Sequence, residues 1–339
     1  MILAAFLLLS GYCRLTAKDV KDVAIITDRP DKEKGPTEVS FFIFVLDIKS
    51  IDGADQSFTA NVFMEIQWKD TRLVQPGDLT RTIPLDDAWN PGVIVANRVG
   101  FLPTSLPEVL KVTPDGTVTY SQRYVGQMSQ PLNLSKFPFD SHRFGIKFVS
   151  TTNTPKEVRF IPMPGKEDKQ ATGGDMTADI SVPDWQIDRF GVKGHPYNPI
   201  EEVDVAGFAF EFSAKRYRWY YVWQIIIPLT FIVMMSWGCF WIDPIHPGAQ
   251  VTVATSSMLT LIAYRFTLGN LIPRLPYMTR MDYFTLLCTT LVFLTFVEVT
   301  ITTVLSYRKK HVPGRMMDKF SRVIFPAVFV IGTLLSLVF

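Results

Sequence analysis

Four long apolar stretches in the second half of the chain constrain its fold more than any other feature. They follow an aromatic cluster at residues 217–223 and cover Ile225–Trp241, Val251–Ile272, Tyr283–Leu305 and Phe320–Phe339. As a helix, about 20 residues at roughly 1.5 Å each cross a hydrocarbon core of about 30 Å. The sequence therefore predicts an all-α domain of four membrane-spanning helices over residues 219–339.

The first half of the chain has a different pattern, in which β-prone runs alternate with turn signals between Val39 and Phe212. In Phe58–Trp68 every second residue is apolar, which predicts a strand with one buried face. Phe63 falls on the polar face of this strand, where an aromatic ring needs a partner surface or a ligand. Many strands without a long helical pattern predict an all-β, immunoglobulin-like antiparallel sandwich over residues 18–218.

Charge and the ends of the spans predict the orientation in the membrane. Residues 18–216 carry 23 Lys and Arg against 28 Asp and Glu, a net charge of −5, whereas the rest of the chain from Tyr217 carries 10 against 4. The basic segment 306–319 is expected to be a short cytoplasmic loop, because basic loops stay inside. Residues 1–17 resemble a signal peptide cleaved after Ala17. A multi-pass protein of the cell (inner) membrane is therefore expected, with the sandwich on the extracytoplasmic side.

Cysteine and histidine usage argues against an enzyme or a metal protein. Cys13, Cys239 and Cys288 leave residues 18–238 without a cysteine, and the four histidines are scattered singly. The front domain therefore has no disulfide scaffold and no thiol nucleophile. No Ser/His/Asp arrangement, paired carboxylates or metal site is visible. We expect no cofactor, no metal, no catalytic residues and no nucleic-acid partner.

The second apolar stretch carries an unusual stripe. Read as a helix, spacings of 4, 3, 4 and 3 place five residues within an arc of roughly 80°. They are Thr252, Ser256, Leu259, Ala263 and Phe266. A hydroxylated stripe inside a membrane span suits a water-filled pore shared by several copies of the helix. The alternative is a small-residue packing face within a helix bundle.

Several motifs, in order along the chain, resemble those of the pentameric ligand-gated ion channels, also called Cys-loop receptors. They are Trp68-Lys69-Asp70 with Leu73, Trp89-Asn90-Pro91 with Asn97, Phe137-Pro138-Phe139-Asp140, Arg216, Pro228 and the joint Asn270–Tyr277. The joint is also similar to that of a bacterial member from Erwinia. Gln130 and Phe144 stand where animal members have the loop cysteines, so the resemblance is to prokaryotic members.

This resemblance implies a homopentamer in which the second span lines the pore and Leu259 forms an apolar ring that can exclude water. It also implies a coupling region between the sandwich and the joint that follows the second span. The residues carried over to that region are Asp52, Phe137, Pro138, Asp140, Arg216, Pro273 and Pro276. Arg216 is expected to pair with Asp140 or with the hairpin at Asp52–Gln56.

The agonist site of the family lies between sandwich domains and is walled by aromatic rings. The positions carried over to it are Ala96, Thr151, Tyr197 and Val205, together with Phe63 from the neighbouring subunit. Because only two of these are aromatic, the usual cation–π box for an amine is mostly missing. Phe63 and Tyr197 either bind a ligand or only pack at an interface, and the stimulus, a small molecule or protons, stays open.

The permeating ion and two alternative functions complete the expectations. The acidic front domain favours cations such as Na⁺ or K⁺. The segment Pro247–Gln250, however, has no charged residue that would indicate the sign of the permeating ion. An anion-selective member of the family is one alternative, and a membrane-anchored sensor without conduction is the other. Glu298, in the third span, is expected to be protonated or paired, with a possible role in proton sensing. Membrane lipid is the remaining expected partner.

Overall fold

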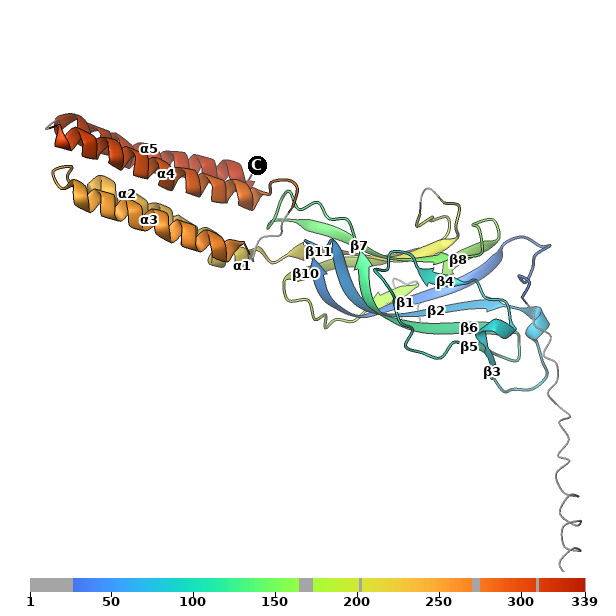
Figure 1. Ribbon diagram of the computed structural model, residues 1–339. Coiled ribbons are helices and arrows are strands. Elements are labelled where there is room, and N and C mark those ends of the chain that lie inside the picture. The colour runs from blue at the N-terminus through green and yellow to red at the C-terminus, as the bar shows by residue number, and fades with distance from the viewer. Residues whose placement is uncertain (1–26, 165–172, 201–202, 270–274, 309–310, 339) are drawn as a thin grey trace, which may run out of the picture.

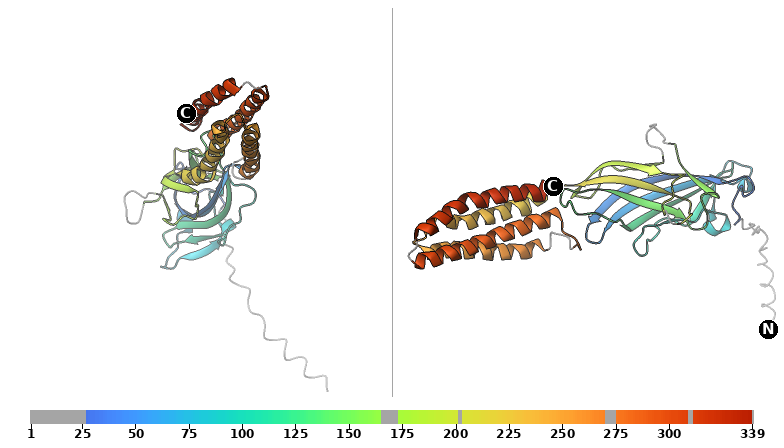
Figure 2. Two further views of the ribbon diagram at one scale, coloured as in Figure 1. Left: turned by 90° about the vertical axis from the view of Figure 1, so that its left-hand side faces the viewer. Right: turned by 90° about the horizontal axis from the view of Figure 1, so that it is seen from above.

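The structure, a computed structural model, describes residues 27–164, 173–200, 203–269, 275–308 and 311–338. A β-sandwich and a bundle of helices lie end to end along one axis (Figure 1). The turned views show the helices running side by side, with the C-terminal end of the last helix next to the sandwich (Figure 2). The predicted signal peptide at 1–17 lies outside the described residues.

Two sheets form the sandwich. The larger sheet has the order β3-β5-β6-β2-β1-β8, with β9 also pairing with β1, and the smaller has the order β10-β11-β7-β4. The strands of the larger sheet are β1 (Thr37–Asp52), β2 (Ser57–Lys69), β3 (Arg81–Pro84), β5 (Val109–Val112), β6 (Thr117–Ser129), β8 (Val158–Pro162) and β9 (Gly174–Met176). Those of the smaller sheet are β4 (Val93–Val95), β7 (Ser141–Ser150), β10 (Trp185–Lys193) and β11 (Gly207–Arg216), and short 3₁₀ turns occupy Thr71–Leu73 and Leu85–Asp87.

The alternation in β2 has the predicted consequence. Its even-numbered residues from Phe58 to Trp68 are buried, whereas the residues between them, Phe63 included, are half-buried. Phenylalanines from both sheets fill the space between the layers. Phe208 of β11 packs on Phe41 of β1 and Phe160 of β8, with ring centroids 4.4 and 4.8 Å apart. The predicted sandwich is therefore confirmed.

The expectation of an antiparallel sandwich is wrong for one region. β1 pairs in parallel with β8, from Thr37↔Val158 onward, and with β9, from Ile43↔Gly174 onward. The strand before β8 is β7, which belongs to the other sheet. Between β7 and β8 the chain therefore crosses from one sheet to the other. Such a crossover permits β8 to run parallel to β1, whereas a hairpin would make two strands antiparallel.

Among the residues that the structure describes, four helical segments are long and apolar enough to cross a membrane: Arg218–Trp241, Pro247–Leu268, Arg280–Tyr307 and Val312–Leu337. The first comprises α1 (Arg218–Tyr221), a π-helical turn (Val222–Ile226), α2 (Ile227–Trp237) and a 3₁₀ turn (Gly238–Trp241). The others are α3 (Pro247–Leu268), α4 (Arg280–Tyr307) and α5 (His311–Val338). The segment 306–319, predicted as a loop, is mostly helical, because α4 ends at Tyr307 and α5 begins at His311. Its Arg315 and Lys319 are exposed on the first turns of α5, as long basic side chains can be at a membrane surface.

A proline links the first span to α3. Pro228 has no amide hydrogen to donate to the carbonyl four residues earlier, which belongs to Gln224. The π-helical turn directly before α2 contains Gln224, and the Tyr264 hydroxyl of α3 donates a hydrogen bond to that carbonyl. A side chain of the next span therefore satisfies the backbone group that the proline leaves without a partner.

The sandwich core yields a stability prediction. Phe208→Ala should lower the midpoint of thermal unfolding of the detergent-solubilised protein by several degrees, since truncating a buried phenylalanine costs about 3–5 kcal/mol. Phe101→Ala is the matched control, because Phe101 is 86% exposed in the subunit. Equal midpoints for the two variants would contradict the assigned core.

Candidate functional site

A buried ion pair stands where the sandwich meets the helices. Asp140 directly precedes β7, and Arg216 ends β11, the strand paired with β7. Arg216 Nε donates to Asp140 Oδ1 at 2.9 Å, and Nη2 donates to Oδ2 at 3.1 Å. This two-pronged geometry fixes orientation as well as distance. Of the two partners predicted for Arg216, Asp140 is the one that forms the ion pair in the structure.

Aromatic rings enclose this pair. The side chains of Arg216 and Asp140 are only 7% and 1% exposed. The guanidinium carbon lies 4.2 Å from the ring centroid of Trp185, 5.0 Å from that of Phe137 and 5.9 Å from that of Tyr221. Cation–π contact stabilises a desolvated guanidinium. Because Tyr221 ends α1 and the other two rings belong to the sandwich, the cation is shared by both domains.

A histidine completes the site. His142 Nε2 lies 2.8 Å from Asp140 Oδ2. Burial raises the pKa of the Asp140 carboxyl, but hydrogen bonds from His142 and Arg216 and the Arg216 charge more than offset it, so that the pKa is lowered overall. Asp140 is therefore an anion at neutral pH, held between two donors.

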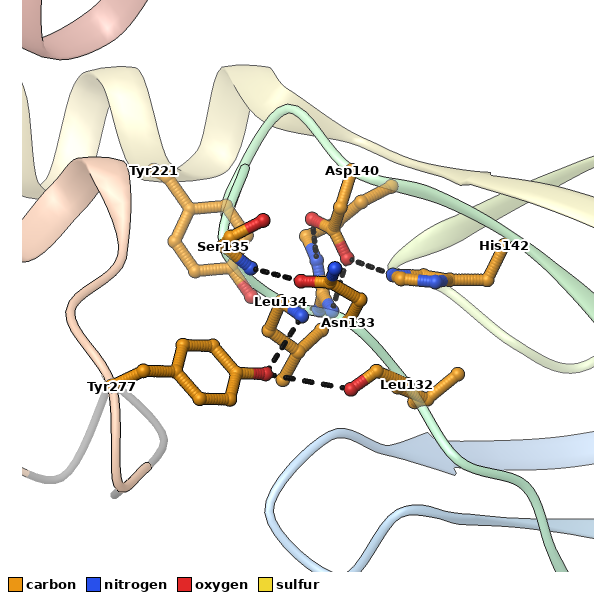
Figure 3. A network of polar contacts seen from close by, with 9 residues as sticks. Leu132, Asn133, Leu134, Ser135, Asp140, His142, Tyr221 and Tyr277 are labelled. Atoms are coloured by element: carbon orange, nitrogen blue, oxygen red, sulfur yellow. Dashed lines mark hydrogen bonds and ion pairs between the residues drawn. The ribbon is translucent and has the colours of Figure 1, made fainter.

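The predicted joint after α3 is bound by the loop before β7. The Tyr277 hydroxyl accepts a hydrogen bond from the Leu134 amide at 3.0 Å and lies 3.4 Å from the Leu132 carbonyl (Figure 3). The Arg280 amide, at the first turn of α4, donates to the Ser135 carbonyl at 3.0 Å. This sandwich loop is therefore in direct contact with Tyr277 and with the start of α4.

The hairpin between β1 and β2 lies against the same loop. A Cβ atom at Gly53 would lie 2.9 Å from Leu134 Cδ1 and 3.9 Å from Arg216 Nη2. Asp52 Oδ1 accepts the Ala54 and Asp55 amides at 2.8 and 3.0 Å and so holds the turn. Asp52 thus shapes the hairpin that packs here, and no contact described by the structure pairs it with Arg216.

The structure describes all but one of the remaining predicted coupling residues. Phe137 and Pro138 are buried in the loop, and Pro276 is exposed beside Tyr277. Pro273 lies outside the described residues, as does most of the joint Asn270–Tyr277, so its predicted similarity to the Erwinia member stays a prediction. His142, Trp185 and the role of Tyr277 were not foreseen. His142 could have been predicted from the sequence, because it is two residues from Asp140 and so shares its face of the strand.

The predicted stripe lies on the open side of α3. All five of its residues are exposed in the subunit. The buried side chains of α3 are Gln250, Ala254, Ser257, Leu261 and Leu268. The exposed hydroxyl of Thr252 bonds to the helix's own Gly248 carbonyl at 2.8 Å. Helix α3 therefore packs against its own subunit with one face and leaves the predicted stripe open.

The positions carried over to a ligand site are spread over both sheets. Ala96 follows β4, Thr151 follows β7, and Tyr197 and Val205 lie between β10 and β11, all next to the smaller sheet. Phe63 lies in β2 of the larger sheet, opposite Phe44 and Arg123. The Lys193 ammonium lies 5.1 Å from the Tyr197 ring centroid. Because the prediction takes Phe63 from the neighbouring subunit, the arrangement within one subunit does not test it, and a shared site stays a prediction.

Metal chemistry finds no support in the part of the chain that the structure describes. There, no three or more His, Cys, Asp or Glu side chains gather closely enough to hold an ion.

Comparison with known proteins gives matches over both domains. Residues 25–217 match the neurotransmitter-gated ion-channel ligand binding domain, and residues 225–314 match the neurotransmitter-gated ion-channel transmembrane region. A proton-gated ion channel from Gloeobacter violaceus is 26% identical over 320 residues, which cover 92% of this chain and 85% of the relative. The gamma-aminobutyric acid receptor subunits alpha-2 of Bos taurus and Homo sapiens are 26% and 25% identical over 80% of this chain. The match spans only 60% of the length of each receptor subunit.

The ion pair yields a prediction with a defined pH dependence. Asp140→Asn leaves the Arg216 cation buried without its counter-charge, which should cost about 3–5 kcal/mol and lower the thermal midpoint at pH 7. Because the pKa of Asp140 is lowered in the folded protein, its contribution is complete above the unfolded value of about 3.9 and is lost as the pH falls through the folded value. The gap between wild type and variant should therefore narrow below about pH 4, and a gap that is constant with pH would refute this account.

Proposed function

Because this chain belongs to the family of neurotransmitter-gated ion channels, we propose that it forms a homopentamer whose central pore is lined by α3. It is a multi-pass membrane protein whose four spans follow an extracellular ligand-binding domain. One observation carries the assignment of the pore helix. The open face of α3 is the predicted stripe, and its inner half bears hydroxyl groups that lipid would not solvate.

Comparison with α5 supports this assignment. Helix α5 is also widely exposed, but its exposed residues are large and apolar, among them Phe320, Val323, Ile331 and Leu334. Such a face suits contact with membrane lipid. The exposed face of α3 contains Thr252, Ser256 and other hydroxyl residues and therefore suits water. An arrangement in which α3 faces a pore and α5 faces lipid gives the exposed face of each helix a suitable environment.

Leu259 is the proposed gate. Its side chain is 63% exposed on the open face of α3, with Thr252 and Ser256 towards the inner end. Five such side chains close to the axis would exclude water and stop ions without touching one another. A signal received by the sandwich would reach α3 through the loop that holds Tyr277 and through the Arg216–Asp140 pair.

We propose cations, Na⁺ and K⁺ among them, as the permeating ions. Each sandwich contributes a net charge of −5 over residues 18–216, and five copies around one axis would attract cations to the entrance. Asp243, at the inner end, forms an ion pair with Arg315 at 2.9 Å, which offsets its negative charge. The proposal of cations therefore rests on the negative charge of the sandwich domains. The exposed Arg265 near the outer end of α3 favours the alternative, an anion-selective pore.

Protons and small molecules are the two proposed classes of agonist. The Gloeobacter relative is a proton-gated channel, and the other relatives are gamma-aminobutyric acid receptor subunits. Phe63 and Tyr197 are the aromatic residues available at the predicted ligand positions. A non-conducting, membrane-anchored sensor is the competing function, and ion flux from purified protein in liposomes separates it from a channel.

The gate assignment predicts the effect of one substitution. Leu259→Ser should raise the basal current or the sensitivity to agonist, because a hydroxyl ring retains water where leucine excludes it. Leu334→Ser is the matched control, since Leu334 is 53% exposed but on α5, and it should leave gating unchanged. Current recordings from both variants test this, and normal gating in Leu259→Ser would refute a Leu259 gate.

The ion selectivity has its own test. In a NaCl gradient across a bilayer, the reversal potential of the current should move towards the equilibrium potential of sodium. A shift towards the chloride value would establish the anion-selective alternative and reject our choice. Arg265→Gln should leave the sign unchanged if the acidic sandwich sets it.

A further inference from the structure

Two carboxyl groups lie together inside the helix bundle, away from the coupling site. Glu298 is on α4 and Asp318 is on α5, and both are nearly inaccessible to solvent, at 5% and 1% exposure. Each carboxyl is close enough to act electrostatically on the other. They lie in the inner part of the bundle, since Asp318 follows the start of α5 by two turns. A bare charge there is expensive.

Each carboxyl has one oxygen with a donor and one without. Ser321 Oγ donates to Glu298 Oε1 at 3.4 Å, and Gln250 Nε2 donates to Asp318 Oδ2 at 3.2 Å. Glu298 Oε2 and Asp318 Oδ1 are buried without a hydrogen-bond partner. Both of these oxygens can be satisfied at once if one proton lies between the two groups, because a protonated carboxyl becomes a donor.

The charges around the pair do not neutralise it. From α5, Arg322 is close enough for its charge to act on Asp318, but it donates its hydrogen bonds to the Phe240 carbonyl at 2.8 and 3.0 Å and lies over the Trp241 ring. Arg315 pairs with Asp243, another acid near Asp318. The Cys239 thiol, at the end of the first span, is close enough to feel the charge of both carboxyls and donates to the Ser236 carbonyl. Among the described residues, no basic group forms an ion pair with Glu298 or Asp318.

We propose that Glu298 and Asp318 form a proton-binding site, in which one proton is shared between the two carboxyls. Two adjacent carboxylates in a dry interior cannot both be ionised without a large desolvation and repulsion cost. The pair takes up and releases this proton as a unit. The site differs from the coupling ion pair, whose carboxyl is neutralised by Arg216.

Gln250 connects the pair to the inner end of α3. Its amide nitrogen also lies 2.9 Å from the Ile242 carbonyl and 3.3 Å from the Cys239 carbonyl, both at the end of the first span. Its side chain is fully buried. Loss of the shared proton would leave two repelling carboxylates on α4 and α5 and would disturb the amide that joins α3 to the first span. Proton occupancy is therefore coupled to the position of the pore helix, an inference that rests on the proposed function.

The first experiment detects the proton itself and needs no current. Infrared spectra of the purified full-length protein, recorded at increasing pH, should contain the carbonyl band of a protonated carboxylic acid that persists above neutral pH. Glu298→Gln should remove that band, and Asp318→Asn provides a second variant if the first does not fold. Asp243→Asn is the control, because Asp243 is exposed, and it should keep the band. A wild-type spectrum without the band, or a band that survives both substitutions, would overturn the site.

The second experiment measures coupling. In excised patches, the open fraction of the wild type should change as the pH on the inner side is raised from about 5 to about 10, a range that includes documented values for buried carboxyls. Glu298→Gln, whose amide can donate to Asp318 at every pH, should lose this response. A wild type that conducts without any response, or an unchanged response in the variant, refutes coupling. Absence of conduction refutes the proposed function but leaves the infrared result standing.

Discussion

The arrangement of the two domains depends on one desolvated cation. Arg216 ends the last strand of the sandwich and precedes α1 by two residues, so its position sets where the first span begins. The Asp140 carboxylate, His142 and three aromatic rings make burial of this charge tolerable. Removing Asp140 would leave the Arg216 charge buried without its counter-charge, and such a mismatch is costly inside a protein. Removing a ring would take away a cation–π contact from the same guanidinium.

The helices have complementary requirements that one subunit alone does not meet. Helix α4 is buried at positions along its whole length, α3 has an open face with hydroxyl groups, and α5 exposes large apolar residues. The same bundle therefore presents surfaces suited to two solvents, water and lipid. Under the proposed function, assembly around a water-filled axis gives each surface its own solvent.

Local patterns predicted much of this structure. The period of two in β2 and the four apolar stretches could be read from the residues themselves. The pairing of Arg216 came from the family resemblance, which left Asp140 and the hairpin at Asp52–Gln56 as alternatives. Parallel pairing of β1 with β8 was not, because it depends on a crossover between sheets. The start of α5 was misread as a loop, since its basic residues lack the apolar character of a span. Trp185 beside Arg216 and Asp318 beside Glu298 are contacts between distant elements, for which the sequence has no local signal. His142 could have been found from its spacing to Asp140.

Pro228 has a consequence beyond the first span. The hydrogen bond from Tyr264 to the Gln224 carbonyl belongs to neither helix's own ladder. It can therefore break and form again without unwinding a turn of either helix, unlike the bonds on both sides of it. The contact between the first span and α3 is therefore a hydrogen bond that can open while each helix keeps its internal hydrogen bonds. The amide hydrogen that Pro228 lacks thus leads to a link between two spans.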